Sequence, residues 1–590
     1  MIIIVYSETN SALIEQNLGK PEYSYYFVLK AFLPILQQLG SVVIVTEPDR
    51  EVDPIYRRAA GRGEDCVFLS FSPPHRTPDH LACPTIPVFA WEYDTIPSDT
   101  WFGERHQDWR FVLNKLGRGI THSTFSVDAV RSAIGSDFPI VSIPAPIFDR
   151  LKKLRALPTP PSEPRRHAIS VSGRIIDTRN IDLSAYSRQD VRPGTIQFAR
   201  GKGDLSAPLE LQLDGVIYTT MLDPYAGRKN YFDMLCGFCW ALRDFEDATL
   251  IFKLSHHDVE DGISYMMENI YKLSPFKCRV ILIDSYLSDD DYEKLLMATT
   301  YVVNTSQAEG QCLPLMECMS VGKPAVAPRH TGMIDYLSTE NAFLVATTGE
   351  PGPWPHDPRG AFRVLHRRID FESLLGAFQE SYSAAKERPE QYNKMAVQAE
   401  KALEAYCSDA VTLERLSAFL VTVPREATPS PEYGKLNPPQ DTYSLGRMID
   451  FATEFDARKY LHFGWAGTEL GLGVWSHGPA AQLSFRIERR PTKPLHLRVN
   501  LSAFVVPEHP TLTVRARIEG LDIAQWTFSI EHPESIHGSW REASIPAEVA
   551  WNRAFYVTLQ IIHPASPRNL GLSGDTRSLG VMLHKLSISL

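Results

Sequence analysis

The segment Tyr301-Val-Val-Asn-Thr-Ser-Gln-Ala-Glu309-Gly310-Gln-Cys-Leu-Pro314-Leu-Met-Glu317 decides how the rest of the chain is interpreted. Its first three residues are apolar and rich in β-branched side chains, which indicates a short buried strand. The residues from Leu313 onward have helical spacing, and Pro314 is suited to the first turn of a helix. The sequence therefore predicts a strand that leads through a turn into a helix.

The turn between this strand and this helix is suited to bind an anion. The first peptide N–H groups of a helix have no partner within it, and they carry partial positive charge. Glu309 lies in the turn and Glu317 lies inside the helix, so their carboxylates can accept hydrogen bonds from neutral hydroxyls. A carboxylate beside a phosphate repels it, but a carboxylate that reaches past it to sugar hydroxyls does not. This combination suggests a nucleotide-sugar.

The residues around the two glutamates form a more specific pattern. Glu309 and Glu317 have Glu-x7-Glu spacing, with Gly310 after the first, Leu-Pro-Leu before the second and Gly-Lys-Pro-Ala-Val following. The pattern resembles the retaining GT-B glycosyltransferases of family 4. The resemblance implies that Glu309 contacts the donor sugar and Glu317 the ribose. It also places the backbone amides of Gln311, Cys312 and Leu313 near the donor diphosphate, together with the adjoining Gly310. The alternative is an ordinary strand, turn and helix with two solvated glutamates.

Length and composition limit the function classes. With about 150 residues per domain as a guide, 590 residues correspond to three or four domains. The net charge of −10 and the pI near 6.0 give the whole molecule no electrostatic footprint for nucleic acid. The start, Met-Ile-Ile-Ile-Val-Tyr, lacks the basic segment of a signal peptide and reads as a first strand. We therefore expect a cytoplasmic protein without a membrane-spanning helix.

The eight cysteines are scattered through apolar runs and fit reduced, buried thiols. Cys236-Gly-Phe-Cys239 has Cys-x-x-Cys spacing, but no second pair completes a zinc site and the motif lies in an apolar helical pattern. Core packing is favoured over a redox or metal role. We expect no metal and no cofactor.

Residues 1–155 are predicted to form an N-terminal Rossmann-like acceptor domain. Strand-like and helix-like runs alternate here, which calls for a parallel sheet with right-handed crossovers. The expected elements are strands at Ile2–Tyr6, Val42–Val45, Cys66–Phe71 and Ile86–Ala90 and a helix at Tyr23–Leu39.

Two loops of this domain are candidates for the site. Gly19 lies in the first loop, where it either lets the backbone approach the donor or serves as a turn residue. The loop Trp91-Glu92-Tyr93-Asp94-Thr-Ile-Pro follows a strand, where ligands of open α/β sheets bind. It resembles the Trp-Glu-x-x-x-Ile-Pro segment of some family 4 transferases. Glu92 or Asp94 could orient or deprotonate an acceptor hydroxyl, and a cap or buried salt bridge is the alternative. For His122 we favour a structural role.

Residues 156–213 read as a linker or insertion because they are rich in proline and lose the strand–helix pattern. They are preceded by the basic cluster Arg150-Leu-Lys-Lys-Leu-Arg155. A solvated face is the favoured interpretation of this cluster, and contact with anionic lipid or a lipid-diphosphate acceptor is the alternative.

Residues 214–422 are predicted to form the C-terminal Rossmann-like nucleotide-sugar domain. Arg228 and Lys229 stand near the start of a helix, where cations are disfavoured by the helix dipole unless an anion joins them. The family resemblance implies that Lys229 contacts the donor phosphates, and Lys253 is a further candidate for this clamp. Tyr286 is placed at the nucleotide base by position alone.

Two helix predictions complete this domain. Ser288, followed by three aspartates, is read as a helix N-cap with favourable charge rather than as a metal motif. A long helix is expected over 389–420, and in the GT-B fold the last helix crosses back to the first domain.

Residues 423–440 read as a linker, and residues 441–590 as an antiparallel β-sandwich, because period-two runs alternate with turns. The segments around Trp465, Trp475 and Asp575-Thr-Arg577 resemble jelly-roll modules attached to bacterial polysaccharide enzymes. Packing or an assembly role is favoured over glycan binding for these residues.

These observations together predict an α/β protein with two Rossmann-like domains of GT-B type followed by an all-β sandwich. The expected function is a metal-independent retaining glycosyltransferase that moves a hexose-type sugar to a glycan or lipid-linked acceptor in bacterial-type surface polysaccharide synthesis. Its expected partners are the nucleotide-sugar donor and that acceptor, with peripheral membrane association and oligomerisation through the sandwich as further options. The competing hypothesis is a non-catalytic glycan-binding or assembly protein on a GT-B scaffold.

Overall fold

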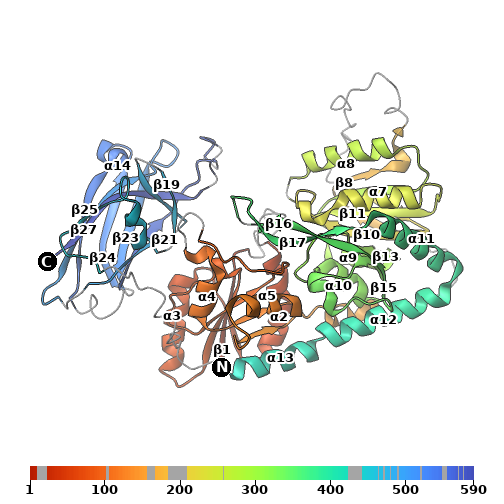
Figure 1. Cartoon of the computed structure of the whole chain (residues 1–590), viewed down its shortest axis with the longest axis horizontal. Helices are drawn as coiled ribbons and strands as arrows, with labels where there is room; N and C mark the ends of the chain where they lie inside the picture. The colour runs from red at the N-terminus through yellow and green to blue at the C-terminus, as the bar shows by residue number, and fades with distance from the viewer. Residues whose placement is uncertain are drawn as a thin grey trace. The chain divides into compact units, whose positions relative to one another are not determined.

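The computed structural model describes residues 1–590 except 10–22, 101–104, 156–166, 184–208, 257, 356, 423–441, 463, 470–471, 479, 488–490, 519–520, 548–554, 569, 574 and 576. The chain divides into two compact units (Figure 1). The first unit comprises residues 1–96 and 116–428, and the second comprises residues 97–115 and 429–590. Gly19 and the predicted linker at 423–440 lie outside the described residues.

The first lobe of the first unit is built on a six-stranded parallel sheet in the order β2-β1-β3-β4-β5-β6. Its strands are short apolar runs, as expected for parallel strands covered on both faces. The strands are β1 (Ile2–Ser7), β2 (Ser41–Ile44), β3 (Cys66–Phe71), β4 (Thr85–Phe89), β5 (Gly119–Thr121) and β6 (Ile140–Ser142), and the helices are α2 (Ser24–Leu39), α3 (Pro48–Ala60) and α5 (Thr124–Ile134). The Rossmann-like prediction is confirmed, and β5 and β6 extend the predicted set.

The second lobe is built on a seven-stranded sheet in the order β15-β14-β13-β10-β11-β12-β8. All neighbours are parallel except β8, which runs antiparallel to β12. The strands are β8 (Arg174–Asp177), β10 (Val216–Leu222), β11 (Ala248–Leu254), β12 (Arg279–Asp284), β13 (Tyr301–Val303), β14 (Ala325–Pro328) and β15 (Ala342–Val345). The helices between them are α7 (Tyr231–Ala241), α8 (Glu260–Leu273), α9 (Asp289–Ala298) and α10 (Leu313–Ser320).

The second lobe begins earlier in the sequence than predicted. Within the expected linker at 156–213, β8 joins the main sheet, and β7 (His167–Val171) pairs with β9 (Leu209–Leu213). Arg279 of β12 secures the β8 edge, since its guanidinium pairs with Asp177 at 2.6 Å and both side chains are buried. These strands are only four or five residues long and lie beside proline-rich segments. The sequence pattern was therefore too short to predict them.

A β-hairpin follows β15 and was not predicted. It consists of β16 (Thr347–Pro353) and β17 (Phe362–Ile369), paired antiparallel. Gly349, Pro351, Gly352 and Pro353 all lie within β16, and these residue types normally argue against a strand. A two-stranded ribbon tolerates them because the strand has one unpaired edge.

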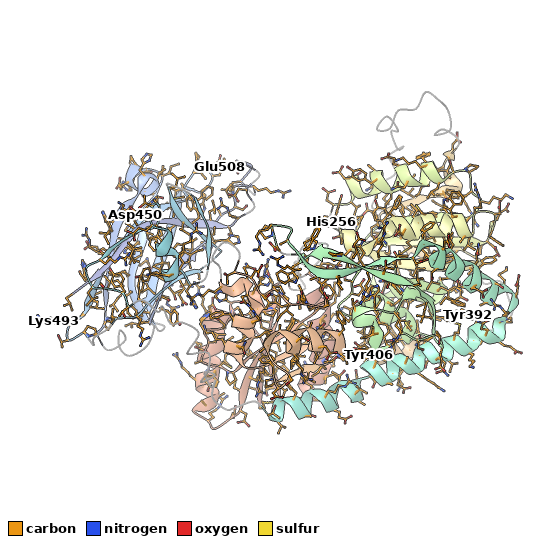
Figure 2. All side chains as sticks on the ribbon, viewed as in Figure 1. His256, Tyr392, Tyr406, Asp450, Lys493 and Glu508 are labelled. Carbon is orange, nitrogen blue, oxygen red and sulfur yellow. The ribbon has the colours of Figure 1, made fainter. Side chains whose placement is uncertain are left out.

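Three helices complete the first unit: α11 (Phe371–Glu387), α12 (Pro389–Cys407) and α13 (Asp409–Val421). The single helix expected over 389–420 is interrupted at Ser408, whose backbone is extended and whose hydroxyl caps α13 by accepting from Val411 N–H. The chain then returns to the first lobe, because the Tyr406 hydroxyl donates to His122 O at 2.7 Å and Asp409 N–H donates to Asp149 Oδ2 at 2.8 Å (Figure 2).

The second unit contains two antiparallel sheets that share one apolar core. One sheet has the order β19-β20-β27-β22-β25 with β18 paired to β27, and the other has the order β21-β26-β23-β24. The strands are β18 (Met448–Asp450), β19 (Trp465–Glu469), β20 (Gly473–His477), β21 (Ala480–Phe485), β22 (Leu495–Ala503), β23 (Thr511–Ile518), β24 (Leu521–Ser529), β25 (Ser539–Ile545), β26 (Phe555–Ile562) and β27 (Leu579–Ser589), and the helices are α4 (Trp109–Leu116, beginning in this unit) and α14 (Pro533–His537). The predicted β-sandwich is confirmed.

Of the residues singled out in the sandwich, Trp465 packs in its core, and the others are at least partly exposed. Trp465 is buried and its indole N–H donates to Gln482 O at 2.8 Å, while Asp575 and Arg577 pair with each other at 2.6 Å. Trp475 is half-buried and lies edge-on to Phe504.

None of the described helices combines the length and the apolar character that crossing a bilayer requires.

Candidate active site

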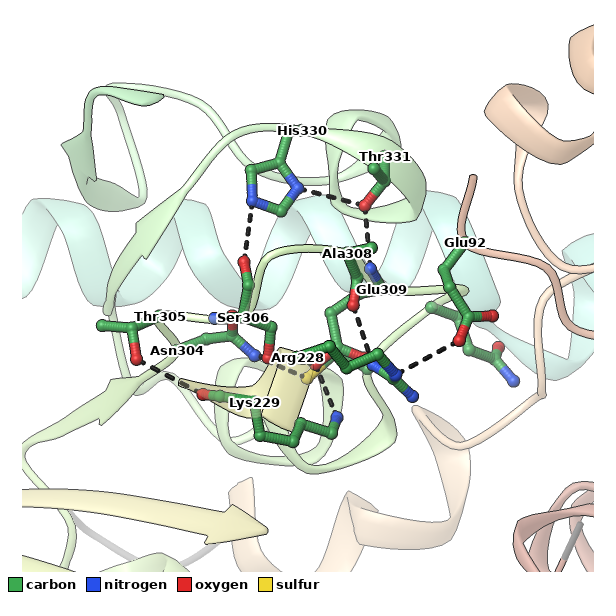
Figure 3. A network of polar contacts seen from close by, with 12 residues as sticks. Glu92, Arg228, Lys229, Asn304, Thr305, Ser306, Ala308, Glu309, His330 and Thr331 are labelled. Atoms are coloured by element: carbon green, nitrogen blue, oxygen red, sulfur yellow. Dashed lines mark hydrogen bonds and ion pairs between the residues drawn. The ribbon is translucent and has the colours of Figure 1, made fainter. Parts of the chain in front are cut away.

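The predicted strand, turn and helix around Glu309 are present as β13, a turn at 304–312 and α10. The Glu309 side chain is only 4% exposed, and its carboxylate accepts three hydrogen bonds at Oε1 (Figure 3). The donors are Lys229 Nζ at 2.6 Å, the Ser306 hydroxyl at 2.6 Å and Asn304 Nδ2 at 3.1 Å. Arg228 Nη1 lies 3.3 Å from Oε2. The turn therefore fixes one carboxylate against two cations.

His330 and Thr331 close a ring of hydrogen bonds behind Glu309 (Figure 3). His330 Nε2 donates to Ser306 O at 2.9 Å, and Glu309 N–H donates to the Thr331 hydroxyl oxygen at 3.0 Å. Burial lowers the pKa of His330 to about 4, so the imidazole is neutral at pH 7 and its Nδ1 accepts from the Thr331 hydroxyl at 3.1 Å. Ser306 also donates to the Glu309 carboxylate. Both the backbone N–H and the carboxylate of Glu309 are therefore held by hydrogen bonds.

Thr331 adopts a left-handed backbone conformation, with φ near 47°. This region is unusual for a β-branched residue, and such conformations persist only where the surrounding structure enforces them. The adjoining Gly332 explains part of the constraint, because a Cβ added there would lie 2.0 Å from Gly310 O. The 330–332 segment is thus packed directly on the Glu309 turn.

Arg228 and Lys229 belong to a 3-10 turn (Gly227–Lys229) that precedes α7 rather than to the helix itself. The turn ends at Asn230, whose φ of 50° is left-handed, and whose carbonyl accepts from the Thr305 hydroxyl at 2.8 Å. Gln307 N–H donates to Arg228 O at 2.7 Å. These bonds tie the cationic turn to the Glu309 turn, so the predicted proximity of the three residues follows from the backbone.

The charges of this cluster determine the protonation of Glu309. Burial alone would raise the pKa of its carboxyl, but Lys229 and Arg228 offset this effect and hold the pKa well below its usual range. Glu309 is therefore ionised throughout the physiological range. Its buried negative charge is compensated by two cations that were predicted to hold a diphosphate.

Glu92 reaches the same cluster from the first lobe. Its Oε1 lies 3.2 Å from Arg228 Nε, and its side chain is 15% exposed. Burial raises the pKa of the Glu92 carboxyl, and Arg228 opposes this shift. The structure thus brings Glu92 to the predicted site as an ion-pair partner of Arg228. This ion pair is the buried salt bridge that the sequence indicated as the alternative role for Glu92.

The residues at the start of α10 are tightly placed. Gly310 lies against the first lobe, since an added Cβ would meet Ala90 Cβ at 3.1 Å. The Gln311 side chain accepts from Ala145 N–H at 3.1 Å. Cys312 has a left-handed φ of 59° and precedes Leu313, the first residue of α10. Burial raises the pKa of the Cys312 thiol to about 12, so it is no nucleophile at neutral pH.

Glu317 is paired with protein groups in this structure, and its expected contact with ribose hydroxyls stays a prediction. Its two carboxylate oxygens are engaged by the Arg150 guanidinium and by the Tyr292 hydroxyl of α9. The side chain is 12% exposed. Both oxygens of the Glu317 carboxylate therefore have protein partners, one of which comes from the basic cluster 150–155.

In that basic cluster Lys152 and Lys153 are exposed, as expected of a solvated face, while Arg155 is largely buried. Besides the Arg150 pair, Lys153 Nζ lies 2.9 Å from Glu293, and Arg155 lies 3.7 Å from Glu400. The Arg155 guanidinium also lies over the Phe148 ring at 3.7 Å. The ion pairs of the cluster were not predicted, because its acidic partners lie more than a hundred residues away.

Lys253 lies in β11 and is 8% exposed. Burial lowers the pKa of its ammonium group to about 8, against the attraction of Asp284. Tyr286 follows β12 in an exposed position, 44% accessible. Neither placement decides whether these residues contact a donor, so both stay predictions.

Asp94 fastens a neighbouring element in this structure, and its role toward an acceptor stays a prediction. Its Oδ1 accepts from Leu365 N–H of β17 at 3.0 Å, which fastens the hairpin to the first lobe. Thr95 adds a hydrogen bond from its hydroxyl to Arg363 O at 2.7 Å, and Trp354 Nε1 donates to the Thr95 hydroxyl at 3.1 Å. The loop after β4 thus gives Glu92 to the cationic cluster and uses its next residues to hold the hairpin.

The other candidates have structural roles. His122 is buried and its Nδ1 donates to Ile143 O at 2.9 Å, while Ser288 caps α9 by accepting from Asp291 N–H. Cys239 is buried in α7 and Cys236 is half-buried. Across the described residues, no group of three or more His, Cys, Asp or Glu side chains is arranged to hold a metal ion.

Sequence reasoning did not identify Asn304, Ser306, His330 and Thr331 as parts of the site. Asn304 and Ser306 follow the predicted strand in the same turn as Glu309. Their closeness to Glu309 in sequence could have indicated that they contact its carboxylate. His330 and Thr331 follow β14, the strand that pairs with β13, and the carboxyl ends of parallel neighbours meet at one edge of a sheet. That rule would have indicated both residues.

Comparisons with known proteins give the following results. No family model and no curated protein sequence matches the chain. Among solved structures the chain is similar to HepE of Anabaena in complex with UDP (14% identity, TM-score 0.41), over 71% of this chain and 99% of HepE. It is similar to a glycosyltransferase of Rickettsia africae (12%, 0.40; 71% and 97% covered). It is also similar to the pneumococcal O-GlcNAc transferase GtfA in complex with UDP and GlcNAc (11%, 0.35; 62% and 59% covered).

Proposed function

We propose that the chain is a retaining glycosyltransferase that transfers a hexose-type sugar from a nucleotide-diphosphate donor to a glycan or lipid-linked acceptor. The observation that carries this proposal is the cluster at the ends of β13 and β10. A buried ionised glutamate there faces Lys229 at 2.6 Å and Arg228 at 3.3 Å, beside the first turn of α10. Cations, free helix amides and a carboxylate together match the phosphates and the hydroxyls of a nucleotide-sugar.

Each group has a distinct task in the proposed reaction. The bond between the sugar C1 and the donor phosphate oxygen breaks, and its electron pair stays on the diphosphate. Arg228 and Lys229 stabilise the growing negative charge, with Lys253 as a further cation. The acceptor oxygen bonds to C1 from the leaving-group face, and its proton passes to the departing diphosphate. Because side chains supply the positive charge, we propose that the reaction needs no metal.

Glu309 holds the sugar during this exchange. The hydrogen-bond ring through Ser306, Thr331 and His330 fixes the carboxylate before the donor arrives, so little orientation is lost on binding. For Glu317 we propose contact with the ribose after Arg150 or Tyr292 gives way. We further propose a cytoplasmic role in surface polysaccharide synthesis, with peripheral membrane contact through the acceptor.

The experiment compares Glu309→Gln with the wild type. Donor panels of UDP-, ADP-, GDP- and dTDP-glucose are screened by thermal shift, since a ligand at a hundred times its Kd adds about 2.7 kcal/mol of stability. Turnover is then measured as release of nucleoside diphosphate with extracted glycan and lipid-linked acceptors. We expect Glu309→Gln to lose about 100-fold or more in kcat, the range of losing one electrostatic contact to the transition state.

The matched control is Glu340→Gln, which removes an exposed carboxylate outside the site. It should keep wild-type turnover. Full activity of a folded Glu309→Gln variant would contradict the assigned role of Glu309, and failure of every sugar nucleotide to stabilise the wild type would contradict the proposed function.

A further inference from the structure

Four charged side chains from two lobes meet in the candidate site. Arg228 lies 3.2 Å from Glu92 and 3.3 Å from Glu309, and Lys229 lies 2.6 Å from Glu309. All four are at least two-thirds buried, with exposures of 29%, 15%, 4% and 19% for Arg228, Glu92, Glu309 and Lys229. Two carboxylates balance two cations, so the cluster is electrically neutral before any ligand binds.

A sugar nucleotide disturbs this balance because each of its two phosphates carries a negative charge. If its diphosphate binds Arg228 and Lys229, it adds that charge beside two carboxylates in a partly buried site. Like charges at such distances cannot all stay ionised without a large cost, as in paired catalytic carboxylates. One of the acidic groups must move away or take up a proton.

The two carboxylates differ in how firmly their negative charge is held. Glu309 accepts hydrogen bonds from Lys229, Ser306 and Asn304 as well as facing Arg228. Glu92 has Arg228 as its ion-pair partner within the described residues. A diphosphate that engages Arg228 and Lys229 therefore weakens the attraction of both cations that favour ionised Glu92, while Glu309 keeps its neutral donors.

We propose that Glu92 takes up a proton from solvent when the donor diphosphate binds Arg228 and Lys229, which restores the charge balance of the site. This inference rests on the proposed function. The charged and titratable groups that face Glu92 are Arg228 and Lys229 from the turn before α7, Glu309 from the turn after β13 and Tyr93 from its own loop. The raised pKa of Glu92 in the ligand-free chain is consistent with this direction.

The proposal changes the role of Glu92 in the reaction. With a donor bound, Glu92 is protonated and acts as a hydrogen-bond donor rather than as a base toward the acceptor hydroxyl. The acceptor proton then leaves with the diphosphate. When the diphosphate dissociates, Glu92 returns its proton to solvent and pairs with Arg228 again, so no net proton is gained over a cycle by Glu92.

The test is calorimetric titration of the full chain with the sugar nucleotide that gives the largest thermal shift among UDP-, ADP-, GDP- and dTDP-glucose. Sugar nucleotides are used because their phosphates do not titrate near neutrality. Titrations in phosphate and in Tris, which differ in ionisation enthalpy, count the protons taken up. We expect about one proton per donor in the wild type and a Kd that weakens by about tenfold per pH unit between the free and bound pKa values of Glu92.

Glu92→Gln should bind the donor with almost no proton uptake and with a Kd independent of pH, so that its affinity exceeds that of the wild type by about tenfold for each pH unit above the free pKa of Glu92 within that window. Glu340→Gln should match the wild type. Equal proton uptake by wild type and Glu92→Gln, or weaker binding by Glu92→Gln, would overturn the proposal for Glu92. Absence of binding by any of the four sugar nucleotides to the wild type would instead remove the proposed function on which it rests.

Discussion

The turn after β13 and the loop after β4 both bring a carboxylate to Arg228, but they hold it differently. Glu309 is fixed by groups of its own lobe, through Ser306, Asn304 and the His330–Thr331 pair. Glu92 is held chiefly by an ion pair to Arg228 that crosses to the other lobe. The Glu309 carboxylate is therefore fixed within its own lobe, whereas Glu92 depends on a cation that, in the proposed function, the donor diphosphate also binds.

The second lobe buries charged groups, which lowers its free energy of unfolding. We expect the largest effect on this free energy at Lys253. Burial lowers its pKa from 10.5 to about 8, so below pH 8 the folded chain holds a poorly solvated ammonium group. Lys253→Met should raise the free energy of unfolding at pH 7 by about 3 kcal/mol, at 1.36 kcal/mol per pKa unit. Its donor Kd should weaken because a cation is lost.

The pH dependence gives an independent check on Lys253. Between pH 8 and 10.5 the unfolded chain still binds the lysine proton and the folded chain has released it, so wild-type stability should rise with pH in this window. Lys253→Met should lack this rise. Urea unfolding at several pH values measures both, and a Lys253→Met variant that is less stable than wild type with unchanged donor affinity would contradict the prediction.

The hydroxyl of Thr331 tests whether the hydrogen-bond ring fixes Glu309. Thr331→Ala removes the acceptor of Glu309 N–H and the donor to His330, and the buried groups left behind should cost about 1–2 kcal/mol. We expect kcat to fall by about tenfold, the equivalent of 1.4 kcal/mol, with little change in KM. Steady-state kinetics at saturating donor measures this effect.

Thr331→Ser is the matched control, because it also removes the β-branched methyl group but keeps the hydroxyl. It should retain most of the wild-type kcat. Equal losses in both variants would show that side-chain packing at the left-handed residue matters, and that the hydroxyl does not position Glu309.

The sequence was most informative where the chemistry is local. The strand, turn and helix from Tyr301 to Ser320 lie within one contiguous stretch, so periodicity, Pro314 and the two glutamates were enough to predict them. Arg228 and Lys229 were found because cations before a helix are unusual. The parallel character of both sheets followed from the same alternation of apolar runs and helices, although β5, β6 and β8 were not among the predicted strands.

Long-range contacts were the part that could not be predicted. Arg150 and Glu317 are separated by 167 residues, so nothing in either segment indicated that they pair. Asp94 accepts from Leu365 across 271 residues, through a hairpin whose first strand carries two prolines and two glycines. Local patterns describe elements well, but the partner of a charged side chain depends on where the chain returns.

Thr95 offers the smallest expected effect and tests the acceptor side. Its hydroxyl donates to Arg363 O at 2.7 Å and accepts from Trp354 Nε1 at 3.1 Å, which joins the loop after β4 to the hairpin. Because Thr95 is exposed, Thr95→Val should cost at most about 1 kcal/mol in stability, the net value of a typical hydrogen bond. If the hairpin positions the acceptor loop, the acceptor KM should rise about threefold to fivefold. The donor Kd should stay unchanged, because the ring around Glu309 lies within the other lobe. Thr95→Ser keeps the hydroxyl and should behave as wild type, and a weaker donor Kd in Thr95→Val would show that the two sides of the site are coupled through the hairpin.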